Sequence, residues 1–248
     1  LPAEWRAIRI SQLLNHTSGV PFHPVLLPED ITPDSVLARA ANEPLEFAPG
    51  AKWSYSNTGY LVLGLLIEKV SGRSYGDFLA SRIFRPAGMT ATHVCETDPP
   101  VGRRAAGYEA RDTGAVVAPP TSMRAVFASG ALCSTVGDIA AWNHAFASGR
   151  VVTPASVARM TTPEGAARAS GYGYGLIVQT FEGHRVFGHG GELEGFRSSN
   201  AYLPDDSLSV TVLTNIRSPS PTPLLLDIVR ITLAAHSRGA VNPTKPGS

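Results

Sequence analysis

The sequence predicts a mixed α/β (α+β) fold, in which an antiparallel sheet is flanked by helices and a largely helical region is inserted. Capped, helix-type segments dominate residues 1–165. Short strand-type segments separated by turns, followed by one more helix, fill residues 166–240. We expect the polar residues 241–248 to form a disordered tail.

The helices of the first region are marked by their ends. Residues 58–71 are apolar almost all round, which predicts a deeply buried helix, and Gly72 follows where a C-terminal cap belongs. Thr32-Pro33 is typical of a helix start. We expect a mostly irregular excursion over residues 97–124. Helices are expected over residues 8–15, 32–41, 58–71, 74–83 and 135–148, and from Pro154 onward.

The second region has the pattern of an antiparallel meander. Its strand-type segments are separated by Glu182-Gly183, by the Gly-rich residues 188–195 and by Pro204-Asp205-Asp206. A closing helix is expected over residues 222–235. The predicted strands cover residues 172–180, 184–187, 197–203 and 207–214.

Composition excludes several classes of protein. A net charge of +1 on 248 residues indicates neither a nucleic-acid partner nor an anionic membrane surface. The longest apolar run, Leu61–Ile67, is too short to span a bilayer. Cys95 and Cys133 lack metal or redox spacing; they could pair, but two free thiols are expected. We expect no metal and no organic cofactor.

Gly72-Arg73-Ser74-Tyr75-Gly76 matches the G-x-S-x-G pattern of a hydrolase nucleophile elbow. An elbow requires a strand leading into it, whereas a buried helix leads into this one. Gly72 is explained by helix capping, and Ser74 is expected to be the N-cap of the next helix. We therefore do not expect this match to be a nucleophile elbow.

Two other stretches, WSYSNTGY and Gly188–Gly191, contain polar residues that are candidates for an active site. Tyr55 and Asn57 are two residues apart in WSYSNTGY, so in an extended chain both point to one side while Ser56 turns back to cap the helix. The alternative is that this stretch is only a helix cap with packed aromatics. His189 lies between glycines in Gly188–Gly191, which lets backbone approach a ligand closely, although a flexible hairpin would have the same composition.

In combination these stretches resemble the serine β-lactamase and penicillin-binding-protein-like hydrolases, in the branch of class C β-lactamases, D-alanyl-D-alanine carboxypeptidases and family VIII esterases. That resemblance implies a β-lactamase/transpeptidase-like fold. It implies catalytic roles for Tyr55 as base and for Asn57 and His189. It places substrate along Gly190, Gly191 and Glu192, with the Glu192 N–H as an oxyanion donor. The matching stretches are IRISQLLNHTSGVP (8–21), FAPGAKWSYSNTGYLVLGLLIEKVSGRSYGDFLASRIFRPAGM (47–89), ASGALCSTVGDIAAWNHA (128–145), GYGYGL (171–176), FGHGGELEGFRSSNAYLPDD (187–206) and VTVLTN (210–215).

One motif of that family is absent from these residues. The chain has three lysines, Lys52, Lys69 and Lys245, and none has Ser three residues before it, so there is no S-x-x-K pair. The resemblance implies that the serine, the lysine, their helix and the N-terminal strands belong upstream of Leu1. We therefore expect this chain alone to be inactive.

The expected activity is acyl-enzyme hydrolysis of an ester, peptide or β-lactam by a serine supplied from upstream. The expected partners are a small-molecule or peptide substrate and the missing N-terminal segment. Two alternatives stay open: a non-catalytic, β-lactamase-like binding protein and an elbow-type esterase that uses Ser74. The resemblance suggests a periplasmic or secreted bacterial protein, with a cytoplasmic esterase as the alternative, and the sequence itself does not fix the compartment.

Overall fold

The computed structural model describes residues 2–22, 31–95 and 104–240. The predicted tail, 241–248, lies outside the described residues. So do 23–30 and 96–103, which include part of the predicted irregular excursion.

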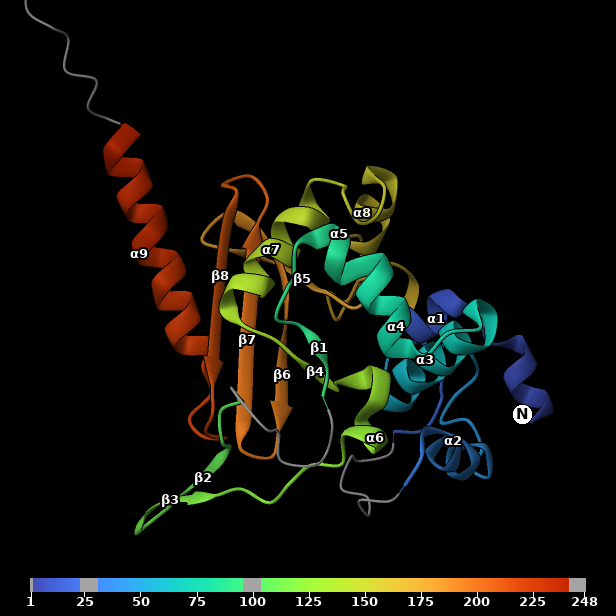
Figure 1. Ribbon diagram of the computed structural model, residues 1–248. Coiled ribbons are helices and arrows are strands. Elements are labelled where there is room, and N and C mark those ends of the chain that lie inside the picture. Colours follow the sequence, from blue (N-terminus) through green and yellow to red (C-terminus); the bar gives the residue numbers. More distant parts are fainter. Residues whose placement is uncertain (1, 23–30, 96–103, 241–248) are drawn as a thin grey trace, which may run out of the picture.

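A four-stranded antiparallel sheet in the order β5-β6-β7-β8 forms the centre of the second region (Figure 1). Each strand follows its neighbour along the chain, so the predicted meander is confirmed. Gly188 pairs with Ile177 on one side and with Ala201 on the other. The strands are β5 (Ile177–Phe181), β6 (His184–Leu193), β7 (Phe196–Leu203) and β8 (Leu208–Thr214).

Helices cover both faces of this sheet (Figure 1). Helix α9 (Thr222–Ala240) buries Leu225 and Val229 against apolar side chains of β6, β7 and β8. Helix α7 (Val136–Ala147) packs Phe146 against Phe187 and Tyr202 on the other face. The result is a helix–sheet–helix sandwich.

A polar pair of the buried Asn143 and the half-buried Asn200 fixes the position of α7 on the sheet. Asn143 donates to Asn200 Oδ1 over 2.8 Å, and Asn200 Nδ2 donates back to Asn143 Oδ1 over 3.0 Å. Asn143 Nδ2 also reaches Ser209 Oγ at 2.8 Å. Because buried amides without partners are costly, this match favours one docking position of the helix.

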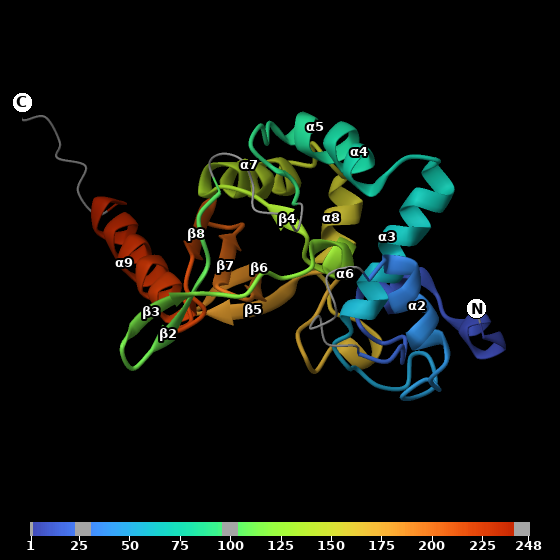
Figure 2. The same ribbon diagram turned by 60° about the horizontal axis from the view of Figure 1, so that its bottom comes forward.

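The remaining helices gather beside the sheet, as both views show (Figures 1 and 2). Most predicted starts are correct: Thr32, Ser74, Thr135 and Thr153 accept a main-chain N–H in the first turn of α2, α4, α7 and α8. Residues 80–84 continue α4 as a π-helical turn. These helices are α1 (Ile10–Leu14), α2 (Pro33–Ala41), α3 (Asn57–Ser71), α4 (Tyr75–Leu79), α5 (Arg85–Ala87), α6 (Met123–Val126) and α8 (Pro154–Met160).

Three sequence predictions about strands need correction. The Gly-rich stretch expected to connect two strands lies largely inside β6, because pairing with β7 continues to Leu193. The first strand of the meander begins five residues later than predicted, because β5 starts at Ile177 and not at Tyr172. The excursion predicted as irregular contains a hairpin of β2 (Tyr108–Arg111) and β3 (Gly114–Val117), whose Tyr108 bridges to Ile216 after β8.

The expectation of two free thiols is wrong, because Cys95 and Cys133 form a disulfide. Two short strands, β1 (His93–Val94) and β4 (Leu132–Cys133), pair antiparallel beside it. Their pairing brings the two Cα atoms to 5.5 Å, a usual disulfide separation. Neither strand has enough length to be recognised in the sequence.

In the part of the chain that the structure describes, no helix combines the length and apolar character needed to cross a membrane.

A side chain at Gly188 would collide with the backbone of β7, and we expect Gly188→Ala to destabilise the protein by about 3 kcal/mol. A Cβ there would lie 1.9 Å from the carbonyl oxygen of Asn200, a backbone atom that cannot move without parting the strands. Two residues along the same strand, a Cβ on Gly190 would lie 3.3 Å from Ser198 O. Gly190→Ala should therefore cost less than about 1 kcal/mol. Urea unfolding of both variants checks this, and equal losses would contradict it.

Candidate active site

The Tyr55–Asn57 stretch lies at the start of α3, where it leaves the loop. Ser56 is the N-cap: it is buried, its backbone is extended, and its Oγ accepts the N–H of Gly59 over 3.2 Å. Asn57 is the first residue of the helix and half-buried, whereas Tyr55 is 37% exposed. The capping role of Ser56 is confirmed, and it leaves Tyr55 facing outward.

The fold brings Tyr55 beside His189, which is far away in the sequence. Their ring centroids are 6.2 Å apart. Tyr172, just before β5, packs against both: its ring centroid lies 6.3 Å from that of Tyr55 and 5.7 Å from that of His189. Two residues predicted separately thus share one aromatic cluster, joined by a tyrosine that the sequence did not single out.

Both ring nitrogens of His189 have partners in this cluster. Nδ1 lies 2.5 Å from the carbonyl oxygen of Gly190, so Nδ1 carries a proton and donates. Nε2 lies 2.9 Å from the hydroxyl of Tyr172. Burial raises the pKa of Tyr172, which keeps it a phenol that donates to Nε2. The ring of His189 is therefore held in one orientation.

The strand that carries His189 has an unpaired edge. Strand β5 pairs with β6 only as far as Gly188, so among the described residues His189–Leu193 pair on one side only, with β7. Gly190, Gly191 and Glu192 are all exposed. An unpaired strand edge offers main-chain N–H and C=O groups to an extended ligand.

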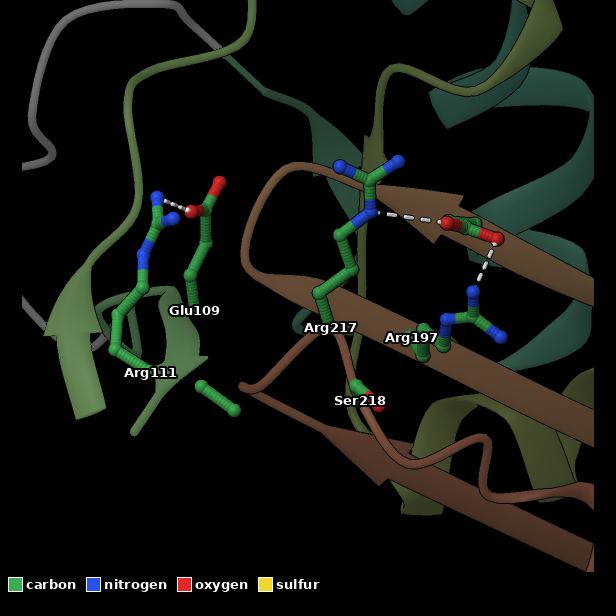
Figure 3. Close-up of a pocket in the computed structure, with 7 residues that line it drawn as sticks. Glu109, Arg111, Arg197, Arg217 and Ser218 are labelled. Carbon is green, nitrogen blue, oxygen red and sulfur yellow. Dashed lines mark hydrogen bonds and ion pairs between the residues drawn. The ribbon is translucent and has the colours of Figure 1, made fainter. Parts of the chain in front are cut away.

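Beyond this edge, Glu192 enters a charged cluster that also lines a pocket of about 320 Å³ (Figure 3). Its carboxylate pairs with Arg197 at 2.7 Å and with Arg217 at 3.0 Å. Hydrogen bonds from Arg217, and then from Arg197, hold the pKa of Glu192 below its ordinary value. Arg217 also pairs with Glu194 at 3.2 Å. These exposed pairs contribute little stability singly, but together they connect the end of β6 to β7 and to the segment after β8.

The electrostatics of this chain keep Tyr55 protonated. Burial raises the pKa of Tyr55, which is opposite to what a general base needs. Lys52 and Lys69, the two lysines in the described residues, are both exposed and do not lower the pKa of Tyr55. A base role for Tyr55 therefore requires a cation from elsewhere.

A histidine that is not among the predicted site residues, His16, lies beneath Tyr55. His16 is 1% exposed, and its ring centroid is 4.2 Å from that of Tyr55 and 4.7 Å from that of Tyr172. Its Nδ1 lies 3.1 Å from the main-chain N of Ser56 and accepts that N–H. Burial, followed by the nearby His189, lowers the pKa of His16 to about 3.

Ser74 lies in a different setting from a nucleophile elbow. It follows Gly72, whose left-handed backbone ends α3, and it caps α4. Its Oγ accepts the N–H of Asp77 over 3.1 Å and donates to the Asp77 carboxylate over 2.7 Å. The prediction that Ser74 is a cap is confirmed.

One group of side chains in the described residues has metal-ligand proximity. The ligand atoms of His93, Cys95 and Cys133 lie within 4.8 Å of one another. Both sulfurs are joined in the disulfide, however, so His93 alone keeps a free ligand atom. This group does not fit a metal ion in its disulfide form.

Comparisons with known proteins agree on one family. The family model called Beta-lactamase matches residues 1–234. A D-aminopeptidase from Brucella canis is 30% identical over 207 residues, which are 82% of this chain and 40% of that protein. This chain thus spans about two fifths of the length of that relative.

Two solved structures have the same fold. A D-stereospecific amidohydrolase from Streptomyces sp. superposes with a TM-score of 0.78 at 27% identity, covering 91% of this chain and 75% of the other. An octameric penicillin-binding protein homologue from Pyrococcus abyssi gives 0.79 at 27% identity, covering 92% of this chain and 56% of the other.

The antiparallel sheet between helices, with further helices beside it, is the β-lactamase/transpeptidase-like fold. This fold defines the class of protein, the serine β-lactamase and penicillin-binding-protein superfamily. The chain belongs to the β-lactamase family.

Proposed function

We propose that this chain forms the Tyr55 and His189 side of a serine hydrolase that works through an acyl-enzyme. The observation that carries the proposal is the meeting of Tyr55 with His189 beside the unpaired edge of β6. The serine and lysine of an S-x-x-K pair would come from a segment outside these 248 residues, because no lysine in them has Ser three positions before it.

In this proposal each residue has one task. Tyr55 takes the proton of the serine hydroxyl as it attacks the carbonyl carbon, and later gives it to the leaving group. The lysine cation lowers the pKa of Tyr55, which burial alone raises. Asn57 contacts the substrate amide. His189 lies beside Tyr55, and with Gly190 and Gly191 it forms the edge along which substrate lies. The Glu192 N–H helps to bind the oxyanion.

We further propose that the substrate is a peptide or amide with a D-configured residue. The support is the likeness to a D-aminopeptidase and to a D-stereospecific amidohydrolase. A K-T-G motif is typical of β-lactamases. His189, followed by Gly190 and Gly191, stands where that motif has lysine, so the lysine cation that would suit a β-lactam carboxylate is missing at this position. An amide substrate therefore fits these residues better than a β-lactam.

A non-catalytic binding protein is the second candidate. Two observations favour it: the lack of an S-x-x-K pair in these residues and the raised pKa of Tyr55. The two candidates differ in whether any serine of the complete polypeptide becomes acylated.

Covalent labelling separates the candidates. This chain and the complete polypeptide are treated with a fluorophosphonate, and the adduct is located by mass spectrometry. We expect an adduct on the S-x-x-K serine in the complete polypeptide and none in this chain. A Ser→Ala variant of that serine is the control. Labelling of neither form would support the binding protein, and an adduct on Ser74 would support an elbow-type esterase.

Stereochemistry tests the substrate class separately. The complete polypeptide is assayed with D-alanine and L-alanine p-nitroanilides at equal concentrations. We expect preferential cleavage of the D-isomer. Equal rates, or cleavage of a fluorescent penicillin in preference to both, would contradict the proposed substrate while leaving the acyl-enzyme proposal intact.

A further inference from the structure

The loop that precedes α3 is held by a short buried segment, residues 15–20. Every residue of that segment is buried, although Asn15, His16, Thr17 and Ser18 are polar. Loop residues donate their main-chain N–H groups to it: Glu46 to Gly19 O over 2.8 Å, Gly50 to Thr17 O over 2.7 Å and Ser54 to His16 O over 3.0 Å. The loop is thus placed through its backbone.

His16 holds this loop on both sides of Tyr55. Its main-chain oxygen accepts the N–H of Ser54, and its side-chain Nδ1 accepts the N–H of Ser56 over 3.1 Å. The ring between these two contacts lies 4.2 Å, centroid to centroid, from the ring of Tyr55. The residues before and after Tyr55, and the ring of Tyr55 itself, all contact one residue, His16.

The backbone of His16 is shaped for this double contact. Its φ is 60°, in the left-handed region, which turns its carbonyl and its ring toward the same loop. The next turn is equally fixed: Gly19 has φ of 78°, and a Cβ there would lie 2.2 Å from Phe47 O. The backbone of residues 16–19 is therefore rigid where it supports the two contacts from His16 to Ser54 and Ser56, which we call the His16 clamp.

A purely apolar packing role does not account for a histidine here. Because Nδ1 accepts, the proton of the neutral ring lies on Nε2, and that buried atom has no hydrogen-bond partner among the described residues. A buried polar atom left without a partner is costly. A phenylalanine side chain would fill the same space without that cost. The hydrogen-bond acceptor at Nδ1 therefore explains why a histidine occupies this position.

We propose that His16 is a positioning residue that fixes Tyr55 for proton transfer by binding the main-chain groups on either side of it. The inference rests on the proposed function of Tyr55. The ring must stay neutral to accept at Nδ1, and the pKa of about 3 keeps it so over the ordinary range of pH.

A pair of variants separates the acceptor from the ring. His16→Phe keeps an aromatic ring but loses the acceptor. His16→Asn loses the ring but keeps a side-chain oxygen near the position of Nδ1, and Asn tolerates the left-handed backbone. In the complete polypeptide we expect His16→Phe to lower kcat about 100-fold with KM little changed. His16→Asn should recover part of that loss.

Non-additivity distinguishes positioning from general damage. In a Tyr55→Phe background, the change His16→Phe should have no further effect on kcat, because the group it positions is already gone. Thr17→Val, which removes the 2.7 Å bond from Thr17 Oγ1 to Asn15 Oδ1 in the same segment, is the matched control. It should reduce the folded fraction but leave kcat per folded molecule unchanged.

Two measurements on the unaltered protein test the clamp if His16→Phe does not fold, or if no activity is found. The ¹⁵N chemical shifts of the His16 ring should show an unprotonated Nδ1 and a protonated Nε2, and the amide of Ser56 should exchange slowly with solvent. A protonated Nδ1, a rapidly exchanging Ser56 amide, or full additivity with Tyr55→Phe would overturn the proposal.

Discussion

Tyr55→Phe is expected to lower kcat about 1,000-fold in the complete polypeptide, while the free energy of unfolding stays nearly the same. The variant removes only the hydroxyl, which under the proposed mechanism carries the proton between serine and leaving group. General acid–base catalysis contributes about 10²- to 10⁴-fold to rate. Because Tyr55 is more than one third exposed and its ring remains, little packing is lost. Burst and steady-state kinetics with a D-alanine p-nitroanilide measure the loss.

Tyr75→Phe is the matched control, because it removes the same hydroxyl from a tyrosine of α4 that packs against Phe127. Its kcat should remain within about twofold of the unaltered protein. If Tyr55→Phe retained more than a tenth of the activity, the general-base assignment would be wrong.

The second large effect is a loss of stability in acid. In the folded protein the pKa of His16 is about 3, whereas an unfolded histidine titrates near its ordinary value of about 6.5. Above that ordinary value both states are neutral, and the contribution of His16 is fully present. As the pH falls from about 6.5 to about 3, His16 binds a proton in the unfolded chain but stays neutral in the folded protein. Stability therefore drops by about 1.4 kcal/mol per pH unit, and the loss levels off below pH 3.

The groups that face His16 define how to isolate its effect. They are Tyr55, Tyr60, Tyr172 and His189. The three tyrosines remain phenols in this range because burial raises their pKa. His189 helps to lower the pKa of His16. Urea unfolding of the unaltered protein and of His16→Asn is compared at several pH values. The difference in unfolding free energy should shrink steadily from pH 6.5 downward. Parallel curves would show that His16 binds its proton equally in both states.

Much of the fold follows from local signals in the sequence. Thr32, Ser56 and Ser74 cap helices as predicted, because a cap depends on a side chain and the N–H groups within three residues of it. The meander was predictable for the same reason, since turns and alternating strands are read over a few residues.

The errors arise where distant pairing decides the structure. The glycines of residues 188–191 suggest a connection, but pairing with β7 keeps them extended as part of β6. The disulfide joins residues 38 positions apart through strands of two residues each. Neither feature leaves a local pattern, so no window of sequence could have revealed it.

The candidate site was predictable only in its motif-bearing residues. Tyr55, Asn57 and His189 belong to short patterns, whereas Tyr172 and His16 are single residues whose contacts form across the fold. The duplicated glycine-tyrosine pattern of residues 171–175 was the one available signal for Tyr172. For His16, the signal was a histidine within an otherwise small and polar turn.

The backbone-mediated attachment of the loop before α3 has a consequence for how the sequence can diverge. Its contacts to residues 16–19 use N–H groups, which every amino acid except proline supplies. Ala48, Ala51 and Lys52 are exposed, so their side chains can change without moving Tyr55. These three positions can therefore be varied in a directed-evolution library, with Gly19 and His16 kept constant, and Tyr55 is expected to keep its place.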